Sequence, residues 1–245
     1  MTFVRVPHTP HLAWLAPGTP RDDKVLTPSE ARELLAHDVI VEEKVDGANV
    51  GFSVDDQGTL RVQSRGSYVL PGSSHPQFKP LSRWLAPRRH ALADALGPDL
   101  ILFGEWCYAT HSVRYTRLPD WLLAFDVYDR SREAFWSVIR RDQLAKQLDI
   151  EIVPRVASGR FELADLVARL GPSTLGADAA EGLYVRREEG DRLIARAKLV
   201  RSEFVQGIGT HWSRGPLRTN LLATVRDVRR ASSSRRRPPA WGTPP

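Results

Sequence analysis

The chain has 245 residues, of which 42% are apolar and 26% are charged, with a net charge of +6. This composition fits one large or two small globular domains and excludes a collagen-like or wholly disordered chain. Since no apolar run is long enough to span a membrane, and the first ten residues lack the core of a signal peptide, we expect a cytoplasmic protein with no membrane partner. Cys107 is the only cysteine, which excludes an intrachain disulfide and a cysteine-rich zinc site.

The positive charge is concentrated near the C-terminus. Residues 226–245 hold six arginines against one acid, Asp227, and so carry five of the six net charges. We expect 231–245 to form a disordered basic tail, which serves either as a sequence-blind tether for phosphates or only as a solubilising extension. Arginine outnumbers lysine 30 to 5 along the chain. Each lysine is therefore a candidate for amine chemistry, which arginine cannot perform near neutral pH.

The first third of the chain predicts a helix followed by a group of strands. Residues 1–26 are rich in proline and glycine and are expected to be irregular. Thr27-Pro28-Ser29-Glu30 is a capping box, which predicts a helix over 28–37. A β-branched strand over 39–45 ends at Asp46-Gly47, and a hairpin is expected from strands 50–54 and 60–64.

The rest of the chain alternates between the two kinds of element. The patterns predict a loop at 66–78, helices at 79–96, 140–148 and 161–170, and strands at 100–105, 121–127, 150–156, 182–187 and 192–200. The expected fold is a mixed α+β domain with mainly antiparallel sheets flanked by helices, spanning 1–230.

The stretch Glu42-Glu43-Lys44-Val45-Asp46-Gly47 carries the strongest chemical signal. A rare lysine ends an apolar strand, is surrounded by acids, and precedes an Asp-Gly turn. Such a lysine is held on a rigid element and aimed into whatever the turn encloses. Taken alone, the pattern fits a surface hairpin with a salt-bridged lysine equally well.

Five further motifs follow Lys44, most of them with a polar or aromatic residue in or beside an apolar strand. They are Ser64-Arg65-Gly66-Ser67, Leu102-Phe103-Gly104-Glu105-Trp106, Leu123-Ala124-Phe125-Asp126-Val127-Tyr128, Ala180-Glu181-Gly182-Leu183-Tyr184-Val185 and Arg196-Ala197-Lys198-Leu199-Val200. In this order the set resembles the covalent nucleotidyltransferases, which include ATP-dependent ligases and mRNA capping enzymes and whose first motif is Lys-x-Asp-Gly. Glu43 and Asn49 resemble the RNA ligase branch, specifically the T4 RNA ligase 2-like group. The resemblance covers roughly residues 39–212.

The resemblance implies the nucleotidyltransferase fold and a three-step reaction. Lys44 attacks the α-phosphorus of ATP to form lysyl-AMP, AMP passes to a 5′-phosphate end of RNA, and a 3′-hydroxyl displaces AMP to seal the strand. The attack needs a neutral amine, so the pKa of Lys44 must fall well below its ordinary value. The acids at 42, 43 and 46 oppose that fall unless metal ions neutralise them, which favours Mg²⁺ or Mn²⁺ as a cofactor beside ATP.

The resemblance also assigns roles to individual residues. It implies phosphate contacts for Arg196 and Lys198, where Arg196 replaces a lysine of the T4 RNA ligase 2-like group. The remaining implied nucleotide contacts are Arg65 near the ribose and incoming phosphate, Phe125 stacked on adenine, Glu43 near adenine, and Glu105 and Glu181 at the ribose and metal. Asn49 matches a position that acts after lysine adenylylation. The candidate metal ligands are Asp46, Glu105, Asp126 and Glu181, and Asp126 is alternatively expected to orient Lys44.

Several alternatives remain open from the sequence. The chain could be a DNA nick ligase, a GTP-using transferase, a transferase that adenylylates something other than RNA, or a non-catalytic nucleotide- or RNA-binding remnant. Residues 201–245 are too few for an oligonucleotide-binding (OB) barrel or a helical C-terminal domain, although 203–230 can hold one or two short helices. His211-Trp212 is expected to be a packing pair. We therefore expect the arginine-rich tail or an accessory protein to supply the missing clamp on RNA, with DNA ends as the alternative substrate.

Overall fold

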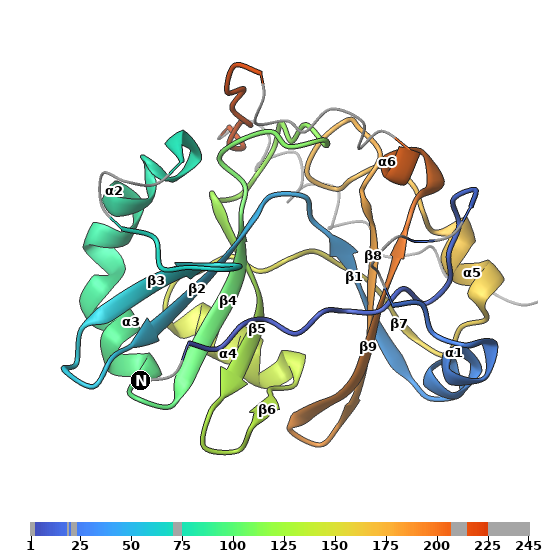
Figure 1. The fold of residues 1–245 in the computed structure, drawn as a ribbon, viewed down its shortest axis with the longest axis horizontal. Helices are drawn as coiled ribbons and strands as arrows, with labels where there is room; N and C mark the ends of the chain where they lie inside the picture. The colour runs from blue at the N-terminus through green and yellow to red at the C-terminus, as the bar shows by residue number, and fades with distance from the viewer. Residues whose placement is uncertain (1–2, 19, 21–23, 71–74, 207–214, 225–245) are drawn as a thin grey trace, which may run out of the picture.

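The computed structural model describes residues 3–18, 20, 24–70, 75–206 and 215–224. Two antiparallel sheets stand side by side, and most of the helices lie on their outer sides (Figure 1). This arrangement confirms the predicted α+β fold with antiparallel sheets. Within the described ranges no helix has the length and apolar character needed to cross a membrane.

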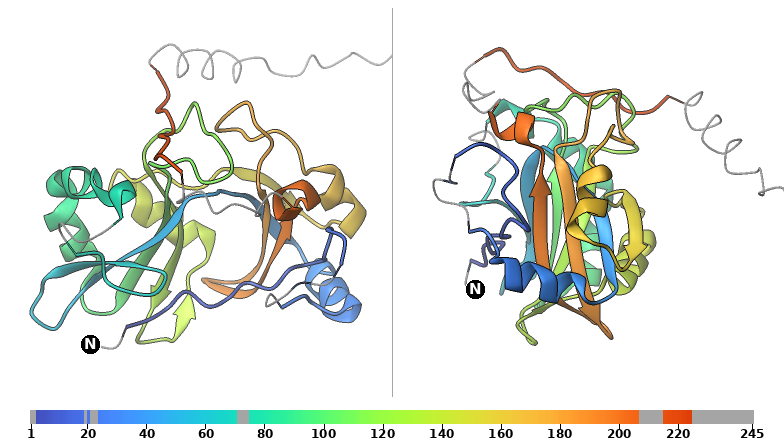
Figure 2. Two further views of the ribbon diagram at one scale, coloured as in Figure 1. Left: turned by 45° about the horizontal axis from the view of Figure 1, so that its top comes forward. Right: turned by 90° about the vertical axis from the view of Figure 1, so that its right-hand side faces the viewer.

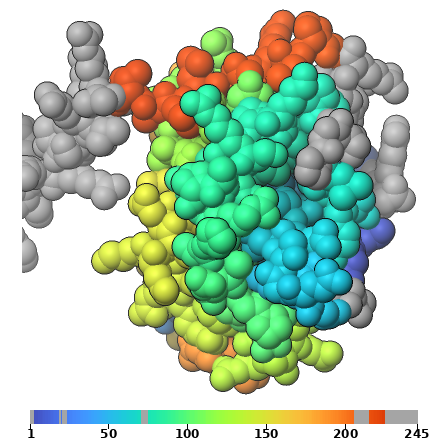
Figure 3. Space-filling view, turned by 90° about the vertical axis from the view of Figure 1, so that its left-hand side faces the viewer, coloured from blue at the N-terminus to red at the C-terminus, as the bar shows by residue number. Residues whose placement is uncertain are grey.

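The five-stranded sheet has the strand order β3-β2-β4-β5-β6. Its strands are β2 (Ala48–Val54), β3 (Leu60–Ser64), β4 (Leu100–Trp106), β5 (Leu122–Asp129) and β6 (Ala134–Phe135). Phe52, Trp84 and Trp106 lie in the core between this sheet and the helices α2 (Leu81–Leu85) and α3 (Arg89–Leu96). Figure 3 shows α2 and α3 covering the outer side of the sheet. Helix α4 (Val138–Gln147) packs against β5.

The helix predicted over 79–96 is broken into short pieces. The turn η1 (Pro76–Phe78) precedes α2, and the turn η2 (Ala86–Arg88) separates α2 from α3. Pro87 lies at the break, and because proline has no backbone N–H and clashes with the preceding turn, a regular helix cannot continue through it.

The four-stranded sheet has the strand order β7-β1-β8-β9. Its strands are β1 (Val39–Lys44), β7 (Arg155–Gly159), β8 (Gly182–Glu189) and β9 (Arg192–Val200). Figure 2 shows α1 (Pro28–Leu35) and α5 (Leu163–Ala168) on the outer side of this sheet. The predicted capping box is confirmed at α1, since Glu30 N donates to Thr27 Oγ1 and Thr27 N donates to Glu30 Oε2.

The strand predicted over 150–156 was placed too early. The observed strand β7 begins at Arg155, directly after Pro154, which cannot donate to a sheet ladder. The apolar pattern that predicted a strand here comes from Ile150 and Val153, which are buried in the cores. Ile152 forms an isolated bridge to Ala124 and is not part of a strand. The helix predicted over 161–170 is likewise shorter than expected, since α5 covers only Leu163–Ala168.

The N-terminal segment 3–14, which we call the strap, is irregular as predicted and runs across the front of both sheets (Figure 1). Gln63 Nε2 donates to Val4 O at 2.7 Å on the five-stranded side. On the other side, Lys198 N donates to Pro10 O and Leu12 N donates to Lys198 O. The strap is therefore tied to both sheets.

The chain beyond β9 contributes the short helix α6 (Ser202–Gln206) and the segment 215–224. Asn220 is buried in this segment, and its Nδ2 donates to Cys107 O at 2.8 Å and to Ala109 O at 3.2 Å. Residues 215–224 are thus part of the folded domain. The predicted tail 231–245 and the pair His211-Trp212 lie outside the described residues.

Candidate functional site

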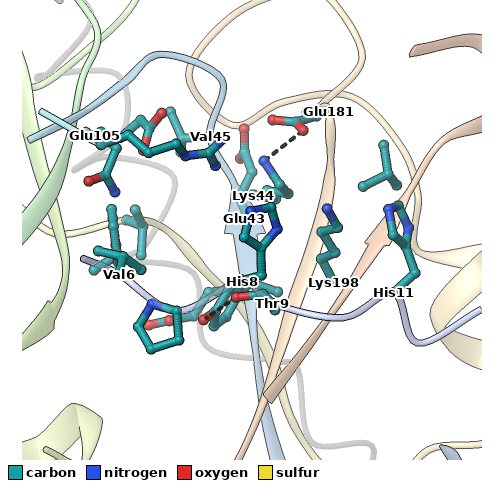
Figure 4. A pocket seen from close by; sticks show the side chains of 18 of the residues that line it. Val6, His8, Thr9, His11, Glu43, Lys44, Val45, Glu105, Glu181 and Lys198 are labelled. Carbon is teal, nitrogen blue, oxygen red and sulfur yellow. Dashed lines mark hydrogen bonds and ion pairs between the residues drawn. The ribbon is translucent and has the colours of Figure 1, made fainter. Parts of the chain in front are cut away.

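A cavity of about 730 Å³ lies between the two sheets, next to the strap. Eight of the predicted site residues line it, and Figure 4 shows several of them pointing toward one another. They are Glu43, Lys44, Asn49, Arg65, Glu105, Phe125, Glu181 and Lys198. The antiparallel sheets thus bring together residues that are up to 155 positions apart in the sequence.

Lys44 ends β1, and the turn after it is fixed by β4. Gly47 N donates to Glu105 Oε1 at 3.1 Å, and a Cβ on Gly47 would lie only 2.8 Å from Trp106 O. Any larger residue at 47 would push the turn away from β4. Asp46 N donates to the buried hydroxyl of Tyr115 at 2.7 Å. These contacts explain why a lysine at this place is followed by Asp-Gly.

The amine of Lys44 is held by a carboxylate. Lys44 Nζ lies 2.6 Å from Glu181 Oε1, and the two side chains are 27% and 8% exposed. Burial lowers the pKa of Lys44, but Glu181, Glu105 and Asp46 outweigh burial and raise that pKa above its ordinary value. The amine is therefore protonated near neutral pH, and it can act as a nucleophile only when its pairing with the carboxylates is weakened.

The two cavity glutamates, Glu105 and Glu181, both have raised pKa values. Burial raises the pKa of Glu105 to about 8, although Lys44 opposes the change. Burial also raises the pKa of Glu181, again against the effect of Lys44. Titratable groups whose pKa values are shifted by burial and by a specific partner are typical of functional sites.

Glu43 also lines the cavity, but its carboxylate already binds a neighbouring loop. Ser173 Oγ donates to Glu43 Oε1, while the amide and hydroxyl of Thr174 both donate to Oε2. Glu43 therefore fixes the 173–174 loop beside the site, and only its remaining lone pairs are available for an adenine contact.

Phe125 occupies a β-bulge in β5. The pairing of β4 with β5 shifts between Phe103 and Gly104, so that Asp126 and Ala124 have partners and Phe125 has none. Bulges re-aim side chains, and this one leaves the Phe125 ring in the cavity wall. The carbonyl oxygen of Phe125 accepts hydrogen bonds from Arg141 Nη1 at 2.8 Å and Arg186 Nη1 at 3.1 Å. Two arginines thus fix the backbone of the predicted stacking residue.

These arginines belong to a group of charged residues that we call the buried arginine network, and Glu42 is the one member that also reaches the cavity wall. The members are Glu42, Asp126, Arg141, Arg186 and Arg196. Arg141 binds Glu42 with both Nη atoms, at 2.6 and 3.1 Å. Asp126 accepts from Arg186 at 2.6 Å and from Arg196 at 2.8 Å.

The roles predicted for Asp126 and Arg196 need correction. Asp126 is fully buried, and each of its oxygens is bound to an arginine, so it neither holds a metal ion nor orients Lys44. Arg196 shares the face of β9 that carries Lys198, as predicted, but it turns to Asp126 and to Pro7 O and does not line the cavity. Its guanidinium is used in the network instead of on a nucleotide phosphate.

Asp46, another predicted metal ligand, does not line the cavity, and one of its oxygens holds a neighbouring loop. Its Oδ2 accepts the backbone N–H groups of Ser112 at 2.6 Å and Val113 at 2.9 Å, so the carboxylate holds that loop beside Lys44. Among the described residues no three His, Cys, Asp or Glu side chains converge to hold a metal ion. Glu105 and Glu181 remain the carboxylates that the cavity itself offers.

Sequence reasoning missed the contribution of the strap to this site. Arg5, Val6, Pro7, His8 and Thr9 line the cavity, and Figure 4 shows the His8 side chain rising from the strap toward Lys44 and Glu43. Thr9 Oγ1 lies 3.3 Å from the hydroxyl of Tyr184 on β8. A Pro-rich segment has no periodicity from which these contacts could be predicted.

Comparisons with known proteins agree with this geometry. A profile of the RNA ligase family matches residues 37–200. A search of the curated proteins finds no match. Among solved structures, the RNA ligase of Naegleria gruberi with PPi has a TM-score of 0.57 and 20% identity, covering 84% of this chain and 64% of that one. A variant of the same ligase with AMP and Mn has a TM-score of 0.55 and 19% identity, covering 84% and 64%.

The chain spans less than two thirds of the length of these structures. At this level of identity the likeness establishes the shared fold. The family profile covers well over half of the sequence, from two residues before the start of β1 to the last residue of β9. The chain belongs to the RNA ligase family.

Proposed function

We propose that this protein is an ATP-dependent RNA ligase that works through a lysyl-AMP intermediate. The observation that carries the proposal is the position of Lys44 at the centre of one cavity with Phe125 and Lys198 on its walls. The aromatic ring of Phe125 suits stacking on a base, and the amine of Lys44 suits attack on a phosphorus. The second lysine, Lys198, suits contact with the phosphate oxygens.

The residues of the cavity act in turn. Phe125, fixed at its bulge, stacks on the adenine and sets the position of the α-phosphorus. Lys44 leaves Glu181, releases its proton to solvent and attacks that phosphorus, and the bond between the α-phosphorus and the bridging oxygen breaks so that pyrophosphate departs. Lys198 stabilises the charge that develops on the phosphate oxygens. AMP then passes from Lys44 to an RNA 5′-phosphate, and a 3′-hydroxyl displaces it.

The cavity fits a divalent metal ion that arrives together with the nucleotide. Mg²⁺ is commonly held by one or two carboxylates plus substrate phosphates, and Glu105 and Glu181 would supply those carboxylates. Bound there, Mg²⁺ or Mn²⁺ would neutralise phosphate charge and lower the pKa of Lys44. A variant of the Naegleria gruberi RNA ligase has been solved with ATP and Mn, which supports this part of the proposal.

The substrate is proposed to be RNA with 5′-phosphate and 3′-hydroxyl ends, as in repair of broken RNA. Membership of the RNA ligase family supports RNA over DNA. Glu43 and Asn49 on the cavity wall favour the T4 RNA ligase 2-like group within that family. An accessory protein or the basic residues after 225 would hold the RNA outside the cavity.

A labelling experiment tests the proposal. The full chain and Lys44→Ala are incubated with Mg²⁺ and either ATP or GTP labelled at the α-phosphate. We expect acid-labile label on the denatured protein from ATP alone, reduced to background in the variant, because alanine offers no nucleophile. The labelled protein should then join nicked RNA.

Other outcomes would move the assignment. Label from GTP would indicate capping-type chemistry, and sealing of DNA nicks alone would indicate a DNA ligase. No label from either nucleotide, in a protein shown to be folded, would contradict the proposal and favour a nucleotide- or RNA-binding role. Label on Lys44 without RNA joining would point to a different acceptor for AMP.

A further inference from the structure

Two arginines on the cavity wall are available to a ligand. Neither Arg5 nor Arg65 makes a hydrogen bond or ion pair with any part of the chain that the structure describes, and both side chains are exposed. The other charges on the wall include several that are already engaged: Lys44 by Glu181, Glu42 by Arg141, and Glu43 by Ser173 and Thr174.

The backbone contacts of the strap bring Arg5 to the segment that carries Arg65. Gln63, two residues before Arg65, donates from Nε2 to Val4 O, directly before Arg5. The rings of Phe3 and Tyr68 meet edge to face with centroids 5.3 Å apart. Segments 3–5 and 63–68 are therefore tied together at two points, which lie on either side of Arg65 and directly before Arg5.

Arg5 is also held from its other side. Arg196 Nη2 donates to Pro7 O at 3.2 Å, so anchors at Val4 and Pro7 flank Arg5 within the strap. Ser64 N and Ser64 Oγ both donate to Ser67 O, which closes a tight turn around Arg65. A guanidinium on a fixed backbone loses less conformational freedom on binding than one on a free terminus.

We propose that Arg5 is a phosphate-binding residue of this site, and that with Arg65 it forms a pair of guanidinium groups at the rim of the cavity. Guanidinium groups bind phosphate through paired, charge-assisted hydrogen bonds, and a polyanionic substrate entering a cavity with four carboxylates on its wall needs such groups. The ligand is a terminal phosphate: either the β- and γ-phosphates of the nucleotide or the 5′-phosphate of RNA. This inference rests on the proposed function for its choice of ligand.

Calorimetric titration of the full chain with inorganic pyrophosphate, and separately with AMP, tests the binding. We expect Arg5→Ala to weaken pyrophosphate binding by about tenfold, the loss typical of one charge-assisted contact, and to leave AMP binding nearly unchanged. Arg5→Lys should recover part of the loss. The control is Arg83→Ala, which removes an exposed arginine on α2 that does not line the cavity.

Two kinetic arms distinguish the sources of the phosphate. One measures labelling of Lys44 at low ATP concentration, and the other measures AMP transfer from isolated adenylylated protein to RNA with a 5′-phosphate. Loss in the first arm assigns Arg5 to the nucleotide, and loss in the second assigns it to RNA.

Wild-type pyrophosphate affinity in Arg5→Ala, with both arms unchanged, would overturn the inference. A wild-type chain that binds pyrophosphate through Arg5 but never labels Lys44 would contradict the proposed function and leave this inference standing.

Discussion

Two groups of charged residues lie between the sheets, and they differ in how completely they are paired. In the buried arginine network the side chains of Glu42, Asp126, Arg141 and Arg186 are at most 1% exposed, and both carboxylates bind arginines with short contacts. In the cavity, Lys44 has a single short ion pair, and burial raises the pKa of both Glu105 and Glu181. The same residue types serve architecture in one place and chemistry in the other.

The difference follows from the cost of burying charge. Leaving a fully buried charge without its partner is costly, so the network is stable between the sheets only when its ion pairs are complete. An incompletely paired group at a cavity wall keeps unused capacity to bind a ligand, at some cost to stability. The network also holds the Phe125 carbonyl, so the architectural group positions a residue of the chemical one.

Removing one member of the network should have the largest effect on stability. Asp126→Ala leaves Arg186 and Arg196 without their shared carboxylate, and we expect the free energy of unfolding to fall by roughly 3–5 kcal/mol. Urea denaturation measures the change. If this variant does not fold, Asp126→Asn, which keeps the shape and part of the hydrogen bonding, should show a smaller loss of the same sign.

The matched control for that change is an acid in an exposed pair. Asp38 and Arg160 are 79% and 72% exposed and lie 3.6 Å apart, so Asp38→Ala should change the free energy of unfolding by less than about 1 kcal/mol. Equal losses in the two variants would mean that the buried network contributes no more than a surface pair.

The cavity group should respond to pH in the opposite sense to an ordinary salt-bridged acid. Because the folded pKa of Glu105 is about 8, above its ordinary value of 4.5, its contribution to stability is full below about pH 4.5 and is lost as the pH rises toward 8. Glu105→Gln cannot ionise and keeps an oxygen for Gly47 N–H. The variant should melt at the wild-type temperature near pH 4.5 and a few degrees higher at pH 8, since ~1 kcal/mol shifts the Tm of a domain of this size by roughly 2–4 °C.

Thermal melts of wild type and variant across this pH range measure the effect. A variant that is less stable than wild type at pH 8 would show that ionised Glu105 is a favourable partner for Lys44, and that the cavity is as well paired as the network. Melts that differ equally at both pH values would show that the change acts through packing alone.

The sequence predicted the cavity residues better than the network because the cavity residues lie in short contiguous motifs, whereas the network is built from ion pairs between distant parts of the chain. Lys44, Asp46 and Gly47 form a contiguous motif, and the motifs around Glu105, Phe125 and Glu181 also keep their neighbours in one strand. The network acids Glu42 and Asp126 lie 99 and 60 residues away from Arg141 and Arg186, respectively, and nothing local predicts these pairs. Asp126 was placed in the site because it follows Phe125, but both of its oxygens bind arginines of the network, which the sequence does not reveal.

Of the other differences between prediction and structure, the broken helix had a signal in the local sequence, whereas the strap and the bulge had none. Pro87 stands inside the predicted helix 79–96 and is a sufficient reason for the observed break. The strap had no such signal, since its position depends on Gln63, Tyr184 and Arg196, which are 59 to 189 positions away from it. The bulge at Phe125 depends on pairing between two strands and is invisible in either one.

The smallest expected effect concerns Arg196, the residue that joins the network to the strap. Lysine at this position can keep its charge beside Asp126 but cannot also reach Pro7 O, so Arg196→Lys should lower the free energy of unfolding by only ~1 kcal/mol while releasing one strap anchor. Hydrogen exchange should report faster exchange of the amides of Arg5, Val6, His8 and Thr9 and little change in β8. Arg192→Lys, at the exposed first residue of β9, is the control. Equal exchange in both variants would mean that the other contacts hold the strap without Arg196, and that the network does not position the strap.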